Sequence, residues 1–239
     1  MVTNSRAWTK ILTVLGSALL ILGLLIASIE MFAVSPDFYR REYKKLGTAQ
    51  SIGISEDDLN RVTDKLIRYT TGAEDDLDMQ AEIQGQMQEV FGEREKAHMV
   101  DVKALYLGAR TVRTVSLVLA AALIAAAFLA GKRDALRALC RSFLWVSAGF
   151  VVVVGAIALY AAVDFTAFWT SFHHVFFTND LWVLDPRTDV LIQMVPEQFF
   201  SDLVARIIAR FVSIFLTLNI AAAAGLVYIR RRRRAAAEG

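Results

Sequence analysis

Residues 11–33, ILTVLGSALLILGLLIASIEMFA, form the apolar run that decides the fold class. A helix needs about 20 mostly apolar residues to cross the roughly 30 Å of hydrocarbon in a bilayer. Three further segments meet this requirement, namely residues 112–130, 143–163 and 211–229. None of these segments alternates between apolar and polar residues as the strands of a membrane barrel do. The sequence therefore predicts an all-α membrane protein with four transmembrane helices.

The composition agrees with this class. The chain has 239 residues, 56% of them hydrophobic, and a mean hydropathy of +0.45. A soluble domain carries fewer apolar residues and distributes them in shorter pieces. Three prolines and thirteen glycines argue against a disordered or collagen-like chain. Because Cys140 is the one cysteine of the sequence, an internal disulfide framework and a zinc ribbon are excluded.

Basic residues predict the orientation of the four helices. Arg6 and Lys10 precede the first apolar run, which is too long for the core of a cleaved signal peptide and is interpreted as a retained anchor. The loop between the second and third runs has Asp134 as its one acid and four basic residues, Lys132, Arg133, Arg137 and Arg141. Short loops rich in lysine and arginine stay in the cytoplasm. With the five arginines of residues 230–234, these segments predict that both termini are cytoplasmic.

This topology divides the chain into eight segments. The predicted boundaries are residues 1–33 for the cytoplasmic N-terminus and first helix, 34–111 for the first extracytoplasmic segment, 112–130 for the second helix, 131–142 for the basic cytoplasmic loop, 143–163 for the third helix, 164–210 for the second extracytoplasmic segment, 211–229 for the fourth helix and 230–239 for the basic cytoplasmic tail. Little folded material is left in the cytoplasm. We therefore expect any chemistry in a small, mainly helical extracytoplasmic domain built from the two outer segments.

The arginine run at residues 230–234 has two interpretations. It could bind nucleic acid or polyanionic lipid, or it could be a stop-transfer anchor held against anionic headgroups. We predict the anchor, and hence membrane lipid rather than nucleic acid as the partner.

The first outer segment carries local helix signals. Ser55 precedes three acidic residues, which is typical of a helix start, and apolar residues then recur at helical spacing as Leu59, Val62 and Leu66. Residues 71–72 end this run, and the acidic residues 73–78 predict a loop. A second helix is expected from about residue 93 to residue 110, continuing directly into the second span.

The second outer segment carries an aromatic stripe. Its members recur at intervals of three, four, seven and eleven residues from the first, as Phe165, Phe168, Trp169, Phe172 and Phe176. At about 100° per residue they share one face of a helix, which we expect to continue outward from the third span. Such a face is typical of an interfacial anchor or of a small-domain core. On the same helix His173 projects beside the aromatic face, and His174 points roughly opposite.

All three histidines, His98, His173 and His174, fall in the predicted outer segments. A lone histidine is more often structural than catalytic, but His98 and His173 lie about 13 and 10 residues beyond their apolar runs, so comparable heights are expected. Straight helices would raise both rings about 15–20 Å above the hydrocarbon. For the rings to act on a group at the membrane surface, the helices must tilt, the spans must begin farther out, or that group must be lifted. Asp101 follows His98 on the same face, where a carboxylate can fix a tautomer.

Two polar residues fall within or next to the apolar runs. Glu30, near the outer end of the first run, is expected either to pair with Arg206 or Arg210 or to line the outer site. Asn219, near the middle of the fourth run, is expected to donate an interhelical hydrogen bond.

Two motifs resemble the signatures of one bacterial family. Residues 172–182, FHHVFFTNDLW, are followed by Asp185-Pro186 and by residues 196–202, PEQFFSD; residues 93–102 read EREKAHMVDV. In combination, and over nearly the whole chain, they are similar to the lipoprotein intramolecular transacylase (Lit) family of four-span membrane proteins. The resemblance implies transfer of an acyl chain from the sn-2 ester of a diacylglyceryl-modified lipoprotein to its N-terminal α-amine, giving the lyso-form lipoprotein.

The resemblance also implies site residues. The family's two catalytic histidines correspond to His98 and His173. Around them the predicted site wall contains Asp101, Asn179, Asp180, Trp182 and Asp185, with structural support of the turn after the helix as an equal alternative for Asn179, Trp182 and Asp185. The predicted substrate face contains Phe168, Trp169, Phe172, Phe176 and Glu30.

Histidine suits this chemistry because the α-amine, with a pKa near 8, must lose a proton before it attacks the ester. We expect His98, oriented by Asp101, to be the base and His173 to stabilise the oxyanion or protonate the departing oxygen, although the two roles can be exchanged. Since amine and ester belong to one molecule, no serine or cysteine nucleophile, metal or cofactor is expected.

Two other functions are compatible with the residues. A zinc-dependent membrane hydrolase would use the three histidines and an outer carboxylate, but adjacent histidines point apart on a helix and no H-E-x-x-H motif occurs. A non-enzymatic membrane subunit or sensor would use the aromatic stripe to dock a partner helix.

Overall fold

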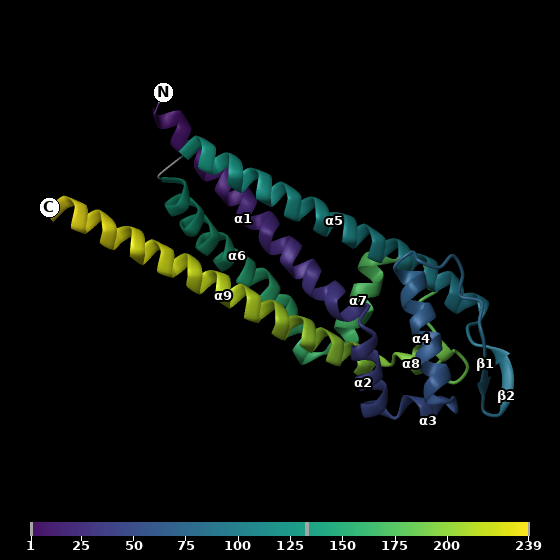
Figure 1. Cartoon of the computed structure of the whole chain (residues 1–239). Coiled ribbons are helices and arrows are strands. Elements are labelled where there is room, and N and C mark those ends of the chain that lie inside the picture. Colours follow the sequence, from purple (N-terminus) through teal and green to yellow (C-terminus); the bar gives the residue numbers. More distant parts are fainter. Residues whose placement is uncertain (1, 132–133, 239) are drawn as a thin grey trace. The chain divides into compact units, whose positions relative to one another are not determined.

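The computed structural model describes residues 2–131 and 134–238. In chain order its elements are α1 (Val2–Ala33), α2 (Pro36–Leu46), α3 (Thr48–Ile52), α4 (Glu56–Thr70), β1 (Gln80–Ile83), β2 (Gln86–Glu89), α5 (Glu93–Gly131), α6 (Ala135–Val163), α7 (Phe165–Phe176), α8 (Val190–Met194) and α9 (Glu197–Glu238) (Figure 1). Lys132 and Arg133 of the predicted basic loop lie outside the described residues.

Four helices are long and apolar enough to cross a membrane, as predicted. Within the described part of the chain they comprise Arg6–Ala33, Glu93–Gly131, Ala135–Val163 and Glu197–Ala237. Two of them are much longer than the apolar runs: α5 has 39 residues and α9 has 42. At 1.5 Å per residue each is about 60 Å long, roughly twice the hydrocarbon thickness. A large part of both helices must therefore lie outside the bilayer.

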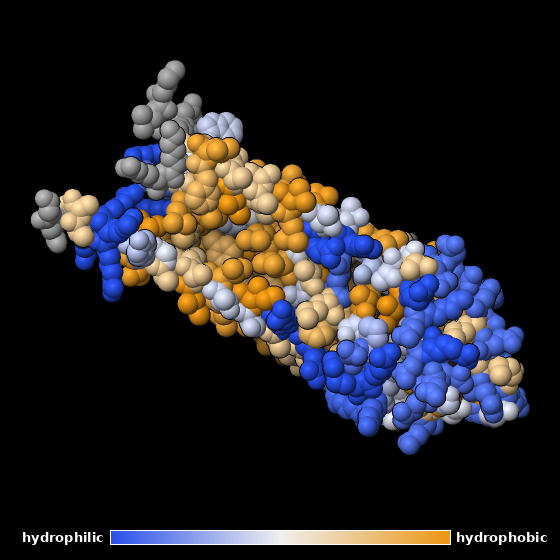
Figure 2. Space-filling model, viewed as in Figure 1, coloured by the Kyte–Doolittle hydropathy of each residue, from blue (hydrophilic) through white to orange (hydrophobic). Residues whose placement is uncertain are grey.

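The chain divides into two compact units. The first, which we call the membrane unit, contains Met1–Ser28, Thr111–Tyr160 and Ile208–Gly239; the second, the site unit, contains Ile29–Arg110 and Ala161–Ile207. Figure 2 shows hydrophobic residues over much of the visible face of the membrane unit and hydrophilic residues over that of the site unit. Apolar side chains such as Val152 and Val163 are more than 70% exposed, as expected where lipid rather than water is the neighbour.

Close helix contacts hold the membrane unit together. A Cβ at Gly23 of α1 would lie 2.6 Å from Leu117 Cδ2 of α5, so only glycine permits this approach. The hydroxyls of Thr13 and Ser142 lie 2.9 Å apart and join α1 to α6. The core consists of Ile21, Cys140, Phe143, Phe211, Phe215 and Ala222. Asn219 was expected to bond between helices, but its Nδ2 donates to the Phe215 carbonyl one turn earlier in α9.

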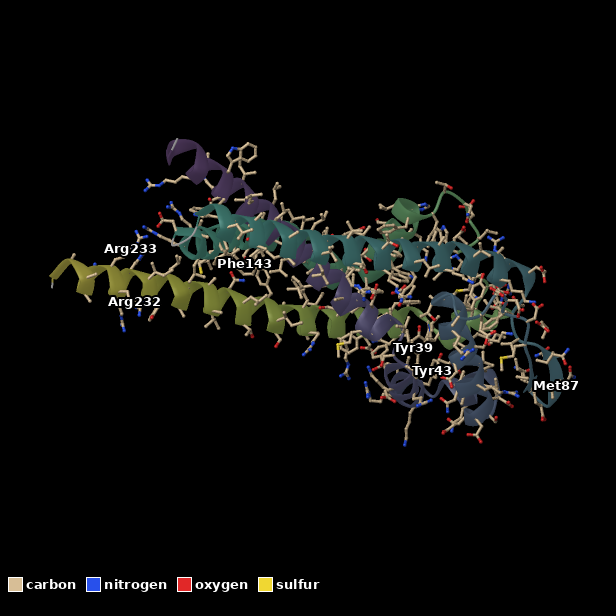
Figure 3. All side chains as sticks on the ribbon, turned by 45° about the horizontal axis from the view of Figure 1, so that its top comes forward. Tyr39, Tyr43, Met87, Phe143, Arg232 and Arg233 are labelled. Atoms are coloured by element: carbon tan, nitrogen blue, oxygen red, sulfur yellow. The ribbon has the colours of Figure 1, made fainter. Side chains whose placement is uncertain are left out.

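The site unit has its own hydrophobic core beneath α2 and α4. Phe38 and Phe199 are fully buried, with ring centroids 5.3 Å apart, and Tyr39 and Tyr43 of α2 pack against Phe199. Figure 3 labels the two tyrosines. The predicted start of α4 is confirmed, because the Ser55 hydroxyl accepts a 3.0 Å hydrogen bond from the Asp58 backbone N–H.

A short hairpin follows the predicted acidic loop and was not anticipated from the sequence. Strands β1 and β2 pair antiparallel, with Ile83 opposite Gln86. Both residues of the turn have positive φ, 54° at Gln84 and 78° at Gly85, which matches the twist of a two-residue hairpin. In β1 only Ala81 and Ile83 are buried, and β2 is exposed throughout. The apolar alternation is therefore too short to be recognised in the sequence.

The aromatic helix is not a continuation of the third span. Helix α6 ends at Val163, and Asp164 has extended backbone angles, φ −146° and ψ 90°. Its carboxylate accepts a 2.9 Å hydrogen bond from the Ala167 N–H and caps α7 as a new helix. Asp164 was not recognised as a helix cap in the sequence because apolar residues flank it on both sides. With this break, the height of His173 no longer follows from a straight extension of the span.

Candidate active site

His173 is held by the last turns of α7. Its side chain is 7% exposed, and its Nδ1 lies 2.7 Å from the Trp169 carbonyl oxygen. A carbonyl can only accept, so Nδ1 carries the hydrogen when this bond is made. The neutral ring then has its lone pair on Nε2. His174, the next residue, is exposed, as the helical-face argument predicted.

His98 lies on α5, and its ring lies next to the ring of His173 in the site unit. The two ring centroids are 6.2 Å apart, and His98 is 8% exposed. Its Nδ1 is buried and has no hydrogen-bond partner among the described residues. Two imidazoles separated by 74 intervening residues are therefore adjacent, which is the central juxtaposition that the sequence predicted.

Aromatic rings surround His173, and one of them also contacts His98. Phe177 contacts both, with its centroid 5.3 Å from that of His98 and 5.7 Å from that of His173. Trp182 stacks on His173 at 4.5 Å, and its buried Nε1 has no hydrogen-bond partner within the described chain. Trp169 meets the edge of His173 at 4.8 Å. No role for Phe177 was predicted, because in the primary structure it is one more apolar residue at the end of the helix.

Burial shifts both histidines toward the neutral form. It lowers the pKa of His98 from 6.5 to about 4, with His173 adding to the shift and Asp101 opposing it. Burial also lowers the pKa of His173, opposed by the hydrogen bond to Trp169 and assisted by His174. Both rings are therefore neutral at pH 7 with one unprotonated nitrogen each, and burial also makes them weaker bases than a free imidazole.

Asp101, which was expected to orient His98, forms no hydrogen bond with His98 Nδ1. Its Oδ2 instead accepts a 2.9 Å bond from Asn179 Nδ2, and Asn179 Oδ1 accepts a 3.0 Å bond from the Leu181 backbone N–H. Asp101 thus ties α5 to the loop that follows α7. Its effect on His98 is exerted through charge alone.

Arg94 binds the same loop, and this contact was not predicted from the sequence. Its Nε donates to the Val183 carbonyl at 3.1 Å, and its Nη2 donates to the Asp180 carbonyl. The forked guanidinium suits two neighbouring acceptors. Because the acceptors are backbone carbonyls, no residue type in the loop indicates the contact. Asp180 therefore belongs to the site region through its backbone.

Glu95 is a second residue whose structural role was not predicted from the sequence. It is 3% exposed and accepts backbone N–H groups from Gly92 at 2.5 Å and from Leu191 at 2.6 Å. The first contact is half of a capping box, which the Gly92-x-x-Glu95 spacing could have indicated. The second fixes α8 to the start of α5. Burial raises the pKa of Glu95, while these two N–H groups oppose the rise.

Asp185 serves the loop rather than the histidines. It accepts from the Arg187 side chain at 2.7 Å and 3.1 Å and from the Arg187 backbone at 2.9 Å. These bonds lower the pKa of Asp185 to about 2. Of the two roles left open for this residue, the contacts favour structural support of the turn.

The predicted substrate-face aromatics form a ladder along α7. Phe165 stacks on Trp169 at 6.0 Å, Trp169 on Phe172 at 5.1 Å with an interplanar angle of 2°, and Phe172 contacts Phe176 at 4.8 Å. Phe176 is 51% exposed. Phe168 extends the ladder through Phe165, at 5.6 Å. Glu30, the other residue predicted for this face, lies near the end of α1. Its side chain is buried, with 8% exposure.

No group of three or more histidine, cysteine, aspartate or glutamate side chains among residues 2–131 and 134–238 is arranged to hold a metal ion. His98 and His173 face each other, whereas His174 is exposed and contacts the edge of Trp182 at 5.3 Å. What the site does contain is two neutral imidazoles in an aromatic shell, a composition suited to moving protons next to an apolar substrate.

Comparisons with known proteins agree on one family. The model of the family described as "Lipoprotein intramolecular transacylase Lit" matches residues 14–200. No curated protein sequence matches the chain. Among solved structures, the chain is similar to the membrane integral lipoprotein intramolecular transacylase Lit from Bacillus cereus, with 20% identity over 95% of this chain and 97% of that one and a TM-score of 0.74.

Two further structures of the Bacillus cereus protein, each with one histidine replaced, are also similar. The arginine variant has a TM-score of 0.72 and 19% identity over 98% of this chain and 97% of its own. The alanine variant has a TM-score of 0.75 and 19% identity over 97% of this chain and 99% of its own. At this level of identity the likeness establishes a shared fold.

Proposed function

The chain belongs to the lipoprotein intramolecular transacylase (Lit) family, and we propose that His98 and His173 carry out its acyl transfer. Family membership and the four apolar helices make the protein a multi-pass membrane acyltransferase that acts on lipoproteins. Membership does not favour the non-enzymatic subunit or the zinc hydrolase. The transfer moves an acyl chain from the sn-2 ester of the diacylglyceryl-cysteine to the α-amine of the same residue, and the lyso-form lipoprotein is the product.

One observation carries the assignment of the site. His98 and His173, on different helices, face each other at 6.2 Å, and the Nδ1 of His173 is committed to the Trp169 carbonyl. That bond leaves His173 Nε2 as the nitrogen that can accept a proton. On this basis we assign His173 as the base and His98 to the carbonyl, the exchanged form of the two roles that the sequence left open.

The proton transfers account for the whole reaction, beginning with the proton of the amine. His173 Nε2 accepts a proton from the lipoprotein's α-ammonium group, whose pKa near 8 otherwise keeps much of it charged at neutral pH. The free amine attacks the ester carbonyl, so that the C–N bond forms and the sn-2 C–O bond breaks. The imidazolium of His173 then protonates the glyceryl oxygen, and the attacking nitrogen releases its surplus proton to water. Acid and base functions are thus supplied by the ring, and no cofactor is required.

Two buried polar atoms without partners support this arrangement. Burying a polar group without a hydrogen bond costs about 1–3 kcal/mol, so such atoms call for a reason. Trp182 Nε1 can donate to the oxygen of the tetrahedral intermediate, and His98 can bind the same oxygen as a neutral donor through Nε2 or hold the amine through Nδ1. Both atoms are buried, so side chains around them must move before the substrate can reach them.

The same residues suggest where the substrate lies. The ladder from Phe165 to Phe176 offers an apolar face to acyl chains, and Glu30 supplies a buried carboxylate in the same unit. By the distribution of basic residues, both termini face the cytoplasm. The site unit then faces the opposite side of the membrane, where lipoproteins are displayed.

The decisive experiment uses the third histidine as a matched control. His98→Ala, His173→Ala and His174→Ala variants are expressed in a host that lacks its own lyso-lipoprotein synthesis, and the N-terminal peptide of a lipoprotein is analysed by mass spectrometry. We expect at least a hundredfold less lyso-form from the first two variants and near-parental yield from the third. Membrane levels and thermal unfolding of the purified variants show whether they fold. Lyso-form production by folded His98→Ala or His173→Ala at the parental level would refute the assignment.

A further inference from the structure

The membrane unit contains a large basic cavity that has no part in acyl transfer. Its volume is about 1040 Å³. Among the described residues that line it, five are basic, Arg6, Lys10, Arg137, Arg141 and Arg233, against the single acid Asp134. All belong to the membrane unit, whereas both catalytic histidines belong to the site unit. The cavity is therefore a second feature of the protein, with a strong positive charge.

Specific contacts hold the walls of the cavity in place. A Cβ at Gly131 would lie 2.7 Å from Thr9 Cγ2, so this glycine allows α5 to approach α1 closely. The hydrogen bond between Thr13 and Ser142 joins α1 to α6. Arg233 of α9 bonds to Asp134 at 2.6 Å, immediately before α6. Figure 3 shows Arg232 leaving α9 on a different side from Arg233, and Arg232 instead lies over the Tyr228 ring.

The lining also contains apolar side chains. Val14, Ala130 and Trp145 line the cavity and belong to the apolar runs, and Ala138 lies between Arg137 and Arg141; Trp145 is 71% exposed. Exposed tryptophan next to arginine and lysine is typical of the membrane–water boundary. Lys10 directly precedes the first apolar run, and Arg141 lies two residues before the third. A ligand at this level would have its polar part among cations and its apolar part along the helices.

From this arrangement we propose that the cavity binds the headgroup of an anionic phospholipid. Guanidinium and ammonium groups bind phosphate oxygens, and several converging on one site give charge-assisted hydrogen bonds. A free phosphate ion would fill only a small part of 1040 Å³ and would not use the apolar lining. A phosphodiester with a glycerol headgroup and attached acyl chains uses both. The lipid would bridge α1, α6 and α9 at their cytoplasmic ends.

The test measures lipid binding to the full chain in detergent. Native mass spectrometry counts bound phosphatidylglycerol and, separately, phosphatidylcholine with the same acyl chains. We expect phosphatidylglycerol to bind at least tenfold more tightly, and an Arg137→Gln/Arg141→Gln variant to bind it roughly tenfold more weakly than the parent. Arg231→Gln/Arg234→Gln removes the same charge from α9 residues that do not line the cavity, and we expect its affinity to change less than threefold.

Three outcomes would overturn the proposal. Equal losses in the two double variants would mean diffuse attraction to a basic surface. Equal affinity for phosphatidylcholine would remove the role of the anionic headgroup. Displacement of the lipid by millimolar inorganic phosphate would assign the cavity to a small anion. Ala138→Trp fills the apolar side without altering charge, so it should also weaken lipid binding, and it serves as the test if the double variant does not fold.

Discussion

Burial of His98 makes the protein's stability sensitive to mild acid. The pKa of this ring falls from 6.5 to about 4 because burial disfavours its charged form. In the unfolded chain the ring regains its ordinary pKa of about 6.5. Below that pH the unfolded state binds a proton that the folded state excludes, so unfolding becomes easier as the pH falls. Above pH 6.5 the His98 ring is neutral in both states and leaves the free energy of unfolding unchanged. As the pH falls from 6.5 to about 4, the free energy of unfolding decreases progressively.

The size of the effect follows from the two pKa values. Their difference corresponds to about 3 kcal/mol at pH 4 and below, and to about 2 kcal/mol at pH 5. Burial lowers the pKa of His173 as well, which acts in the same direction. Replacing His98 with glutamine removes one titrating ring and leaves the other groups, Glu95 among them, common to both proteins. Between pH 7 and pH 5 the variant should therefore lose about 2 kcal/mol less stability than the parent.

The measurement is chemical unfolding of the purified full chain in detergent at pH 7 and pH 5, followed by circular dichroism. The quantity compared is the pH-dependent change within each protein, so any baseline destabilisation by the substitution cancels. His174→Gln removes an exposed histidine one residue from His173 and should keep the parental acid sensitivity. If His98→Gln loses as much stability between pH 7 and pH 5 as the parent does, His98 is not a buried neutral ring and the reasoning fails.

Three further predictions concern the loop and the aromatic shell. Trp182→Phe keeps an aromatic ring but removes the buried Nε1–H; lyso-form yield should fall at least tenfold while the melting temperature stays within about 5 °C, and retained yield would exclude a role in catalysis. Arg94→Lys should cost about 1 kcal/mol in chemical unfolding and speed amide hydrogen exchange at Val183, because one ammonium cannot reproduce the forked contact. Asn179→Ala and Asp101→Ala should each lower activity severalfold, and the double variant should be no worse than the poorer single one; additive losses would mean that their 2.9 Å bond is not the shared cause.

Family membership and the local chemistry of the histidines account for different parts of the function. The family establishes lipoprotein acyl transfer for the chain. The hydrogen bond from His173 Nδ1 to Trp169 supplies the argument about which nitrogen works as the base. A pH–rate profile of the parent and of the His173→Gln variant would connect the two.

The sequence alone determined the features that depend on short stretches of chain. Four apolar runs predicted four membrane helices, because crossing hydrocarbon requires about 20 apolar residues in a row whatever their neighbours are. The Ser55 cap was predicted because its partner is three residues away. The opposite directions of His173 and His174 followed from the 100° step of a helix.

Only the tertiary structure decided the contacts that make the site. Asn179 reaches Asp101 across 78 residues, and Arg94 reaches the Val183 carbonyl across 89. Neither distance leaves a periodic trace in the sequence, and backbone carbonyl acceptors carry no residue identity at all. The break at Asp164, by contrast, rests on a bond to Ala167 three residues away and is as local as the Ser55 cap. Local geometry therefore determines the helices and, through the bond to Trp169 four residues earlier, which nitrogen of His173 is committed. Packing between distant segments brings His98 against His173 and decides which buried groups surround them.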